Sequence, residues 1–390
     1  MKEIREILKA FGEAQKLGKL TALATVVHVD GSSYRRPGAR MLITEDGRLT
    51  GAISGGCLEG DALRKALLVM MQQKSMLVTY DTNDEEDAKL GMGLGCNGII
   101  QVLIEPINAS DQDNPIQLLK KILTGKRKKN ALVTLFSLQN KRKVQYGTRL
   151  LVAEDGGVSG EAPVFMDILV SDANEVLANK HSSFKNYIAE NNSLTAFIEL
   201  VQPPISLIII GAGNDVMPLV AMADILGWET TVVDGRPDHA KKERFMAACQ
   251  VLVSKPENVL EQLEIDEQTV FLLMTHNYHY DLAMLRALVT RSVAYIGSLG
   301  PKKKLDRMVA ELKGEGISLT DQQLDTLYGP VGLDIGAETP EEIALSILAE
   351  IKAVFSSKSG QSLRTNPGVI HFRPDLAIEP VDINRRGKYL

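Results

Sequence analysis

The apolar positions divide the chain at two consecutive prolines, Pro203 and Pro204. Residues 205–210 directly after them form an unbroken apolar run, which is typical of a strand buried on both faces of a parallel sheet. Further apolar runs follow with helical stretches between them, at residues 230–233, 269–274 and 292–296. Strands that alternate with helices in this way predict a doubly wound, Rossmann-like parallel sheet over residues 205–355.

The end of this region carries a helix start signal. Thr339, Pro340 and Glu342 supply the N-cap, the first-turn proline and the capping-box glutamate of a helix over residues 343–354. Beyond that helix the chain is polar and poorly periodic. We therefore expect residues 356–390 to form a C-terminal tail.

Residues 1–200 have shorter apolar segments between polar turns and predict an α+β domain. Strands are expected over residues 21–27, 40–44 and 49–54, and a helix over residues 58–73. Residues 1–19 place apolar side chains at helical spacing among charges, so they contain no signal-peptide core.

This N-terminal half contains an internal repeat, an expected β-hairpin scaffold that returns after 109 residues. Residues 38–47 (GARMLITEDG) return as residues 147–156 (GTRLLVAEDG). We call the two repeats copy one, about residues 20–105, and copy two, a degenerate version at about residues 130–200. Chance similarity between two short hairpins is the alternative, since turn residues recur for local steric reasons.

Copy two lacks the polar loops of copy one. The segment Gly31-Ser32-Ser33-Tyr34-Arg35-Arg36-Pro37 has no counterpart in residues 140–146, and Ser54-Gly55-Gly56-Cys57 becomes Pro163-Val164-Phe165-Met166. Both copies would be expected to keep loops that the fold alone required. We therefore assign the chemistry of this half to copy one.

Two cysteines, Cys57 and Cys96, are flanked by glycines, which leaves each thiol in an open loop that a large ligand can approach. A soft thiolate suits molybdenum or sulfur transfer, and nearby arginines can lower a thiol pKa and clamp a phosphate. The third cysteine, Cys249, is expected to be a buried structural residue. No C-x-x-C pair or matching histidines accompany them, which disfavours a tetrahedral zinc site.

The second half offers a dinucleotide-type turn. Gly211 and Gly213 follow the first predicted strand, and Asp234 ends the second, where a carboxylate normally accepts from ribose hydroxyls. Val216 replaces the third glycine, and Asp215 adds a negative charge where phosphate would lie. The pattern fits NAD(P) or another nucleotide, and the alternative is a Rossmann-like domain that serves packing or dimerisation.

Polar residues also follow two later strands of the predicted sheet. His276, His279 and Asp281 are candidates for proton transfer or metal binding, with helix capping by Asn277 or Asp281 and surface histidines as the alternative. Gly297 opens a segment that runs to Lys304 and offers a glycine turn and cations to an anion.

Composition narrows the class of protein. The net charge of −5 lacks the basic excess that nucleic-acid binding needs, and no apolar run approaches the roughly 20 residues of a membrane span. Three cysteines without a secretory signal disfavour a disulfide framework and favour a reducing cytoplasm. We expect a cytoplasmic protein that binds neither nucleic acid nor membrane and forms the symmetric homodimer usual for such domains.

These segments together resemble the xanthine dehydrogenase accessory factor family of the XdhC and CoxI type. The resemblance extends from about residue 21 to residue 352 and rests on several segments of both halves: residues 31–39, 54–60, 93–96, 211–213, 233–237, 275–276, 295–297 and 332–344. The Gly-Gly-Cys loop and the long run at residues 332–344 are its most specific parts. Asn214 departs from the family pattern, in which His or Asp is common, and Asn97 replaces a glycine after Cys96.

The resemblance implies an accessory protein that binds and transfers its ligand and does not turn it over. Such a carrier would bind molybdenum cofactor (molybdopterin), protect it during sulfuration by a cysteine desulfurase, and deliver it to a molybdenum hydroxylase apoenzyme. Cys57 would contact the cofactor, as a candidate molybdenum contact, and the arginine region would face the pterin phosphate. The assigned cofactor residues of copy one are Ser32, Ser33, Arg35, Arg36, Arg40, Gly55, Gly56 and Cys57.

Two other interpretations of the sequence stay open. An NAD(P)-dependent oxidoreductase would use Cys57 as a redox group, His276 for the proton, and Gly211, Gly213, Asp234, Arg236 and Gly297 for the nucleotide. Cys96 is the remaining catalytic candidate. A regulatory protein would only sense a nucleotide. The sequence also leaves open whether Cys57 bonds molybdenum, carries persulfide sulfur or shapes its loop.

Overall fold

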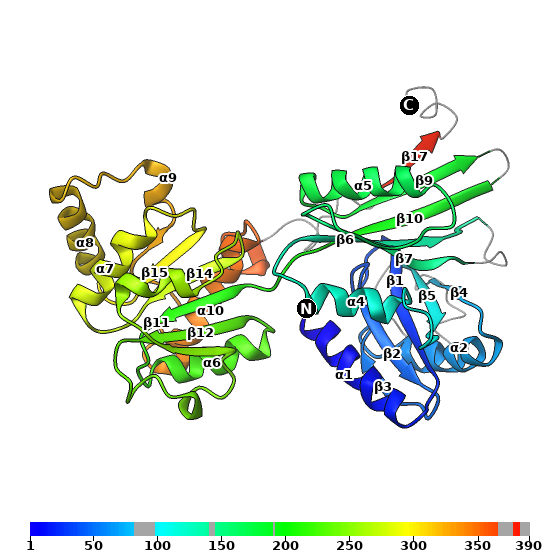
Figure 1. Cartoon of the computed structure of the whole chain (residues 1–390), viewed down its shortest axis with the longest axis horizontal. Helices are drawn as coiled ribbons and strands as arrows, with labels where there is room; N and C mark the ends of the chain where they lie inside the picture. Colours follow the sequence, from blue (N-terminus) through cyan, green and yellow to red (C-terminus); the bar gives the residue numbers. More distant parts are fainter. Residues whose placement is uncertain (82–97, 140–144, 190–191, 366–376, 383–390) are drawn as a thin grey trace. The chain divides into compact units, whose positions relative to one another are not determined.

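The computed structural model describes residues 1–81, 98–139, 145–189, 192–365 and 377–382 (Figure 1). The chain forms two compact units, one of residues 1–203 with the C-terminal residues from 371 onward, and one of residues 204–370. The fold class predicted from the sequence is confirmed, with an α+β N-terminal half and a parallel sheet in the second half. No helix in the described ranges is long and apolar enough to cross a membrane.

The first unit contains two sheets in which five strands follow the same order, and the second sheet has β17 as an additional edge strand. One has the antiparallel order β3-β2-β1-β5-β4, and the other has the order β17-β9-β10-β6-β7-β8. The strands of the first sheet are β1 (Thr21–Gly31), β2 (Arg40–Thr44), β3 (Leu49–Gly51), β4 (Met76–Asp81) and β5 (Gly98–Pro106). Those of the second are β6 (Asn130–Phe136), β7 (Gly147–Ala153), β8 (Val158–Gly160), β9 (Ser183–Ala189), β10 (Asn192–Val201) and β17 (Ile378–Asp382).

The helices repeat as well. They are α1 (Lys2–Lys16), α2 (Glu59–Gln72), α4 (Pro115–Thr124) and α5 (Met166–Asn179). Helix α2 packs on β1 and β5, and α5 packs in the same way on β6 and β10. The internal repeat found in the sequence is thus a repeat of a whole sheet and its helix, of which the matched hairpin is the best-preserved part.

Strand β1 shows why both sheets are needed. Its residues Ala22, Ala24 and Val26 face the cluster beneath α2, whereas Leu23 and Val27 pack with apolar side chains from copy two. The strand is consequently buried on both faces over most of its length. Each sheet uses one face for its own helix and the other for the neighbouring copy.

Each copy contributes one glutamate that forms hydrogen bonds with the other copy. Glu199 on β10 pairs with both terminal nitrogens of Arg40 on β2, and Glu105 on β5 accepts from the backbone nitrogen (2.8 Å) and hydroxyl (3.0 Å) of Thr148 on β7. Gly38 and Gly147, which are equivalent in the repeat, have φ of +91° and +88°, and a Cβ on either would collide with the facing glutamate. Burial raises the pKa of Glu105, although the Thr148 hydrogen bonds oppose this.

The second unit is a six-stranded parallel sheet with the order β13-β12-β11-β14-β15-β16. Its strands are β11 (Ser206–Ile210), β12 (Glu229–Asp234), β13 (Gln250–Val253), β14 (Thr269–Leu273), β15 (Tyr295–Ser298) and β16 (Leu327–Tyr328). Its longer helices are α6 (Val216–Ile225), α7 (Tyr278–Leu288), α8 (Lys302–Gly314) and α10 (Pro340–Phe355), with the short α9 (Asp321–Leu324). Apolar clusters lie on both faces of the sheet, as the unbroken apolar runs predicted.

Helix α10 begins as the sequence predicted. The Thr339 side chain accepts from the Glu342 nitrogen, and the Glu342 side chain accepts from the Thr339 nitrogen, with Pro340 in the first turn. Several predicted strand boundaries are wrong, since β1 extends to Gly31, β3 ends at Gly51 and β15 begins at Tyr295. The segment expected to be a tail also contains β17, which pairs in parallel with β9 of the first unit.

The Arg40–Glu199 pair gives a first prediction about stability. Arg40 is 2% exposed and Glu199 is 16% exposed, so Arg40→Ala leaves a largely buried carboxylate without its cation and should lower the free energy of unfolding by about 3 kcal/mol or more. Arg149→Ala at the equivalent position is the matched control, because Arg149 is 37% exposed and lies 3.6 Å from an exposed Asp111. The control should cost about 1 kcal/mol or less.

Urea unfolding of the full chain, followed by far-UV circular dichroism, measures both changes. Trp228, the chain's one tryptophan, lies in the second unit and reports that unit separately by fluorescence. Equal losses in the two variants, or a shift of the Trp228 transition alone, would contradict the assigned role of Arg40.

Candidate functional site

The two polar loops of copy one lie together. The first connects β1 to β2 and contains Tyr34, and the second connects β3 to α2 and contains Gly55 and Gly56. Tyr34 is 73% exposed, and its ring lies 3.7 Å from the position that a Cβ of Gly55 would occupy. Gly56 has φ of +112°, which a residue with a side chain rarely adopts. The sequence motif therefore corresponds to one surface site bordered by an aromatic ring.

Ser54 and Glu59 hold the second loop in place. The Ser54 hydroxyl oxygen accepts from the backbone nitrogens of Gly56 (3.2 Å), Cys57 (3.1 Å) and Leu58 (3.1 Å), and it donates to Glu59. The Glu59 carboxylate also accepts from the backbone nitrogens of Ile53, Ser54 and Leu58. Burial opposes ionisation, but the hydrogen bonds from Ser54 and the backbone prevail and lower the pKa of Glu59.

Cys57 is exposed at the end of this loop, next to the first turn of α2. Phe165, at the position of Gly56 in copy two, also has positive φ, at +59°. Met166 stands where copy one has Cys57, and it opens α5. A positive φ at this position is therefore common to both copies, whereas the exposed thiol belongs to copy one alone.

Arg35 and Arg36 of the first loop and Arg40 at the start of β2 lie in different surroundings. Arg36 is exposed, and Arg35 is partly exposed and paired with Glu3. Arg40 is buried, and its guanidinium donates to Glu199 and to the Gly38 carbonyl, so its side chain does not face solvent. The loop itself is shaped by Ser33, whose buried hydroxyl donates to the Arg35 carbonyl at 2.6 Å, whereas Ser32 is exposed.

The predictions for the other two cysteines, Cys96 and Cys249, fare differently. Cys96 lies outside the residues that the structure describes. The expectation that Cys249 is buried is wrong, because it is exposed beside the edge strand β13. The chain accordingly offers a second exposed thiol, in the other unit, that lacks the Gly-Gly loop.

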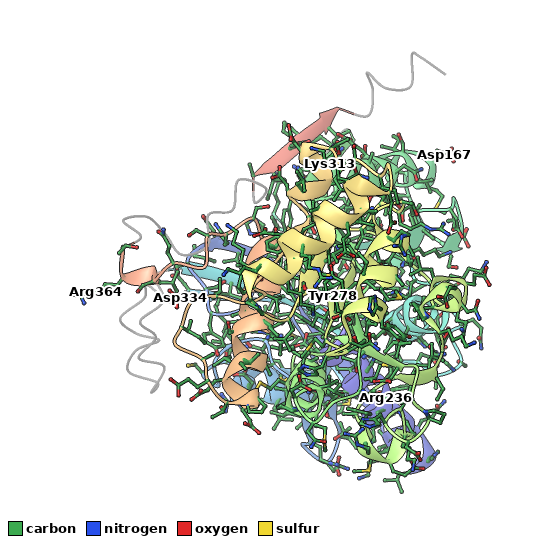
Figure 2. All side chains as sticks on the ribbon, turned by 90° about the vertical axis from the view of Figure 1, so that its left-hand side faces the viewer. Asp167, Arg236, Tyr278, Lys313, Asp334 and Arg364 are labelled. Carbon is green, nitrogen blue, oxygen red and sulfur yellow. The ribbon has the colours of Figure 1, made fainter. Side chains whose placement is uncertain are left out.

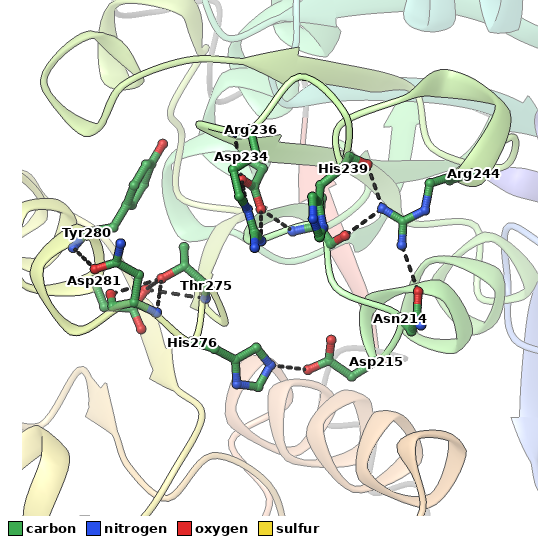
Figure 3. A network of polar contacts seen from close by, with 12 residues as sticks. Asn214, Asp215, Asp234, Arg236, His239, Arg244, Thr275, His276, Tyr280 and Asp281 are labelled. Atoms are coloured by element: carbon green, nitrogen blue, oxygen red, sulfur yellow. Dashed lines mark hydrogen bonds and ion pairs between the residues drawn. The ribbon is translucent and has the colours of Figure 1, made fainter.

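The second unit presents its polar residues where β11, β12 and β14 end (Figure 3). The sheet order changes direction between β11 and β14, which is the position where ligands bind in open α/β sheets. Gly211, with φ of +128°, leaves no room for a Cβ because the Met274 carbonyl lies 2.3 Å from that point. Asp234 lies beside this turn and accepts from the Ala212 nitrogen at 2.9 Å.

An arginine and a histidine complete this edge. Arg244 donates to the carbonyls of Ala212 and His239 and to the Asn214 side chain, so it holds the glycine turn from outside (Figure 3). His276 has φ of +56°, is 66% exposed, and places its Nε2 3.0 Å from the carboxylate of Asp215. The negative charge of Asp215, the N-cap of α6, therefore lies against an imidazole.

The proposed group of His276, His279 and Asp281 does not form one site. Asp281 is fully buried, where it accepts from the Thr275 hydroxyl (2.6 Å) and from Lys304 (2.6 Å), while His279 is exposed. Asn277 caps α7, as the alternative predicted. Within the described ranges, no three histidine, cysteine or acidic side chains gather in a way that could hold a metal ion, so the metal hypothesis for this segment is wrong.

Gly297 also lies inside the fold. It is within β15, and a Cβ there would meet the side chains of Leu272 and Val331 at less than 3 Å. Its role is therefore close packing against neighbouring side chains. Sequence reasoning did not single out Tyr34, Ser54, Glu59 or Arg244; the first three lie within segments that it quoted, and Arg244 gave no local signal.

Comparisons with known proteins agree with this division into two units. A family model described as the XdhC Rossmann domain matches residues 207–351, and one described as the XdhC and CoxI family matches residues 14–81. A protein of Bacillus subtilis (strain 168), named as a probable xanthine dehydrogenase subunit, is 32% identical over 84% of this chain and 91% of its own length. The molybdenum cofactor insertion chaperone PaoD of Escherichia coli (strain K12) is 23% identical over 90% of this chain and 88% of its own length.

A solved structure is similar over almost the whole chain. The crystal structure of a xanthine dehydrogenase from Bacillus halodurans covers 93% of this chain and 98% of its own, with a TM-score of 0.73 and 31% identity. The family resemblance drawn from the sequence is thereby confirmed.

The carboxylate of Glu59 gives a prediction about the thiol loop. Glu59→Gln keeps the shape of the side chain but removes acceptors, and should lower the free energy of unfolding by about 2 kcal/mol at pH 7. Because folding lowers the pKa of Glu59, its contribution is present above the ordinary value of 4.5 and is lost as the pH falls below it. The difference between wild type and variant should therefore shrink in acid.

Urea unfolding at several pH values measures this difference. Glu45→Gln is the control, because Glu45 is an exposed carboxylate of the same unit. A Glu59→Gln effect that stays constant through the acid range would show that Glu59 is not an ionised acceptor of this loop.

Proposed function

Because this chain belongs to the XdhC and CoxI family, we propose that it takes part in the maturation of a molybdenum hydroxylase. In this proposal the chain binds molybdenum cofactor, keeps it accessible for sulfuration, and inserts it into the apoenzyme. The observation that carries the proposal is the exposed Cys57 on a Gly-Gly turn that Ser54 and Glu59 hold. The name of PaoD, a molybdenum cofactor insertion chaperone, supports it.

The residues of copy one fit such a cargo. A thiolate is a soft ligand that suits molybdenum, and the glycines beside Cys57 leave space for a large group to approach the sulfur. The exposed Tyr34 ring offers a face for a planar heterocycle, and Arg36 offers N–H donors to a phosphate. We assign Ser32 and Arg35 to the rim of the same site.

The loop has few free backbone donors of its own. Its N–H groups donate to Ser54 and Glu59, so recognition of the cargo falls to side chains. A turn held in this way presents the thiol in one orientation, which lowers the conformational cost of binding. Such rigid presentation suits a carrier that binds its cargo and later releases it.

The proposed partners follow from this role. They are a molybdenum hydroxylase apoenzyme, a cysteine desulfurase that supplies sulfur, and a second copy of this chain in a homodimer. The exposed thiol at the end of a surface loop is accessible to a protein partner, which transfer between proteins requires.

We also propose a nucleotide site in the second unit. The glycine turn after β11, Asp234 at the end of β12 and the change of direction of the sheet favour it. The His276–Asp215 pair adds an acid–base group at the same edge, which an NAD(P)-dependent oxidoreductase would use. That second function predicts turnover, whereas the carrier function predicts binding without turnover.

Cys57→Ser tests the carrier function. A hydroxyl is a harder and poorer ligand for molybdenum, so the variant should bind isolated molybdenum cofactor about tenfold more weakly or worse. Cys249→Ser is the matched control, since it removes the exposed thiol of the other unit. Cys96→Ser shows whether the second glycine-flanked cysteine contributes.

Anaerobic titration with the cofactor, with bound molybdenum measured per chain, gives the affinities. Circular dichroism checks that each variant is folded. Equal affinity of wild type and Cys57→Ser would exclude the thiol contact. No binding by the wild type would remove the carrier function and leave nucleotide-dependent turnover as the better hypothesis.

A further inference from the structure

The carboxylate of Asp234 has its hydrogen-bonding positions filled by the protein. Oδ1 accepts from the backbone nitrogen and Nε of Arg236, both at 2.9 Å. Oδ2 accepts from the Ala212 nitrogen at 2.9 Å and from Nη2 of Arg236 at 2.8 Å. The side chain is only 4% exposed. In the usual dinucleotide fold this carboxylate accepts from the ribose hydroxyls, but here each oxygen already has two donors.

Arg236 occupies the places that a ribose would need. Its Nε and Nη2 each donate to a different oxygen of Asp234, as the two hydroxyls of a ribose diol would. A ligand with a free diol must break this charge-assisted fork before it can bind to Asp234. Such a ligand therefore competes with a group that the chain carries itself.

The exposed side of Arg236 favours a phosphate, whereas its paired side excludes a free diol from Asp234. The Arg236 side chain is 52% exposed and lies at the surface of the second unit (Figure 2, Figure 3). A guanidinium has more N–H donors than the fork uses, and these can bind a phosphate while Asp234 holds the group in place. The strand end thus presents a cation where a dinucleotide fold usually presents an anion.

We propose that Arg236, held by Asp234, makes this site select a ribonucleotide with a phosphate on its ribose over the same nucleotide with a free diol. The inference rests on the proposed nucleotide site and names its ligand class. Asp234 acts here as a positioning residue, because it orients Arg236 and fills its own acceptor positions. Arg236 is the residue that contacts the ligand.

NAD⁺ and NADP⁺ are the test ligands, since they differ only in the phosphate on the ribose. In calorimetric titration, the wild-type chain should bind NADP⁺ about tenfold to a hundredfold more tightly than NAD⁺, as expected for added hydrogen bonds between charged groups. Arg236→Ala should lose this preference, with weaker NADP⁺ binding and unchanged or tighter NAD⁺ binding because Asp234 is released. Arg236→Lys should keep part of the preference, because it keeps the charge without the fork.

Arg286→Ala is the matched control. Arg286 also forms a two-pronged pair with a carboxylate, Glu315, but on the exposed side of α7 and α8. Its loss should leave both affinities unchanged. Trp228 fluorescence and circular dichroism show whether each variant is folded.

The outcomes separate the two proposals. If the wild type binds both ligands equally, or if Arg236→Ala keeps the preference for NADP⁺, the role of Arg236 is wrong while the nucleotide site stands. If the wild type binds neither ligand, both are wrong. Tighter NAD⁺ binding with weaker NADP⁺ binding in Arg236→Ala supports the proposal, because loss of a merely structural contact would weaken both.

Discussion

The first unit depends on the mutual burial of its two copies. Each sheet has an apolar face that its own helix does not cover, and the neighbouring copy covers it. Where the sheets meet, the reciprocal glutamates Glu105 and Glu199 each reach a residue of the other copy. Because a buried carboxylate is costly without donors, these contacts fix the position of one copy against the other. The β1–β2 loop starts and ends on this rigid base.

The repeat explains how the thiol loop could gain chemistry without loss of the fold. Gly56 lies three residues before the first residue of α2, and its equivalent Phe165 lies one residue before the first residue of α5. Both residues have positive φ. A positive φ at this position is therefore compatible with the glycine of copy one and with the phenylalanine of copy two. Copy two keeps a Phe165–Tyr187 stack at this point, whereas copy one has an open backbone, a free thiol and an exposed ring. Copy two thus uses this position for packing, whereas copy one uses it to expose a thiol.

The sequence predicted those features whose cause is local. Unbroken apolar runs predicted the parallel strands, and Thr339 with Glu342 predicted the start of α10, because capping involves residues three positions apart. Strand β13 was missed because its apolar run of three residues is short, and it lies at the edge of the sheet with its residues partly or fully exposed. The burial of Arg40 could not be predicted, since its partner Glu199 lies 159 residues away. Cys249 was wrongly expected to be buried for a similar reason, because edge position is a property of the assembled sheet.

Both candidate sites follow one rule that the motifs alone do not show. The polar groups of the segments that the motifs mark are partly used by the protein itself. Ser54 and Glu59 accept hydrogen bonds from the backbone amides of the thiol loop, and Arg236 donates to Asp234. A ligand can therefore bind only to the groups that have no partner in these internal contacts, because buried polar groups are normally paired within the protein. At the first site this is the Cys57 thiol beside Tyr34, and at the second it is the outer edge of a guanidinium. A carboxylate that would attract hydroxyls in isolation thereby holds an arginine that attracts an anion.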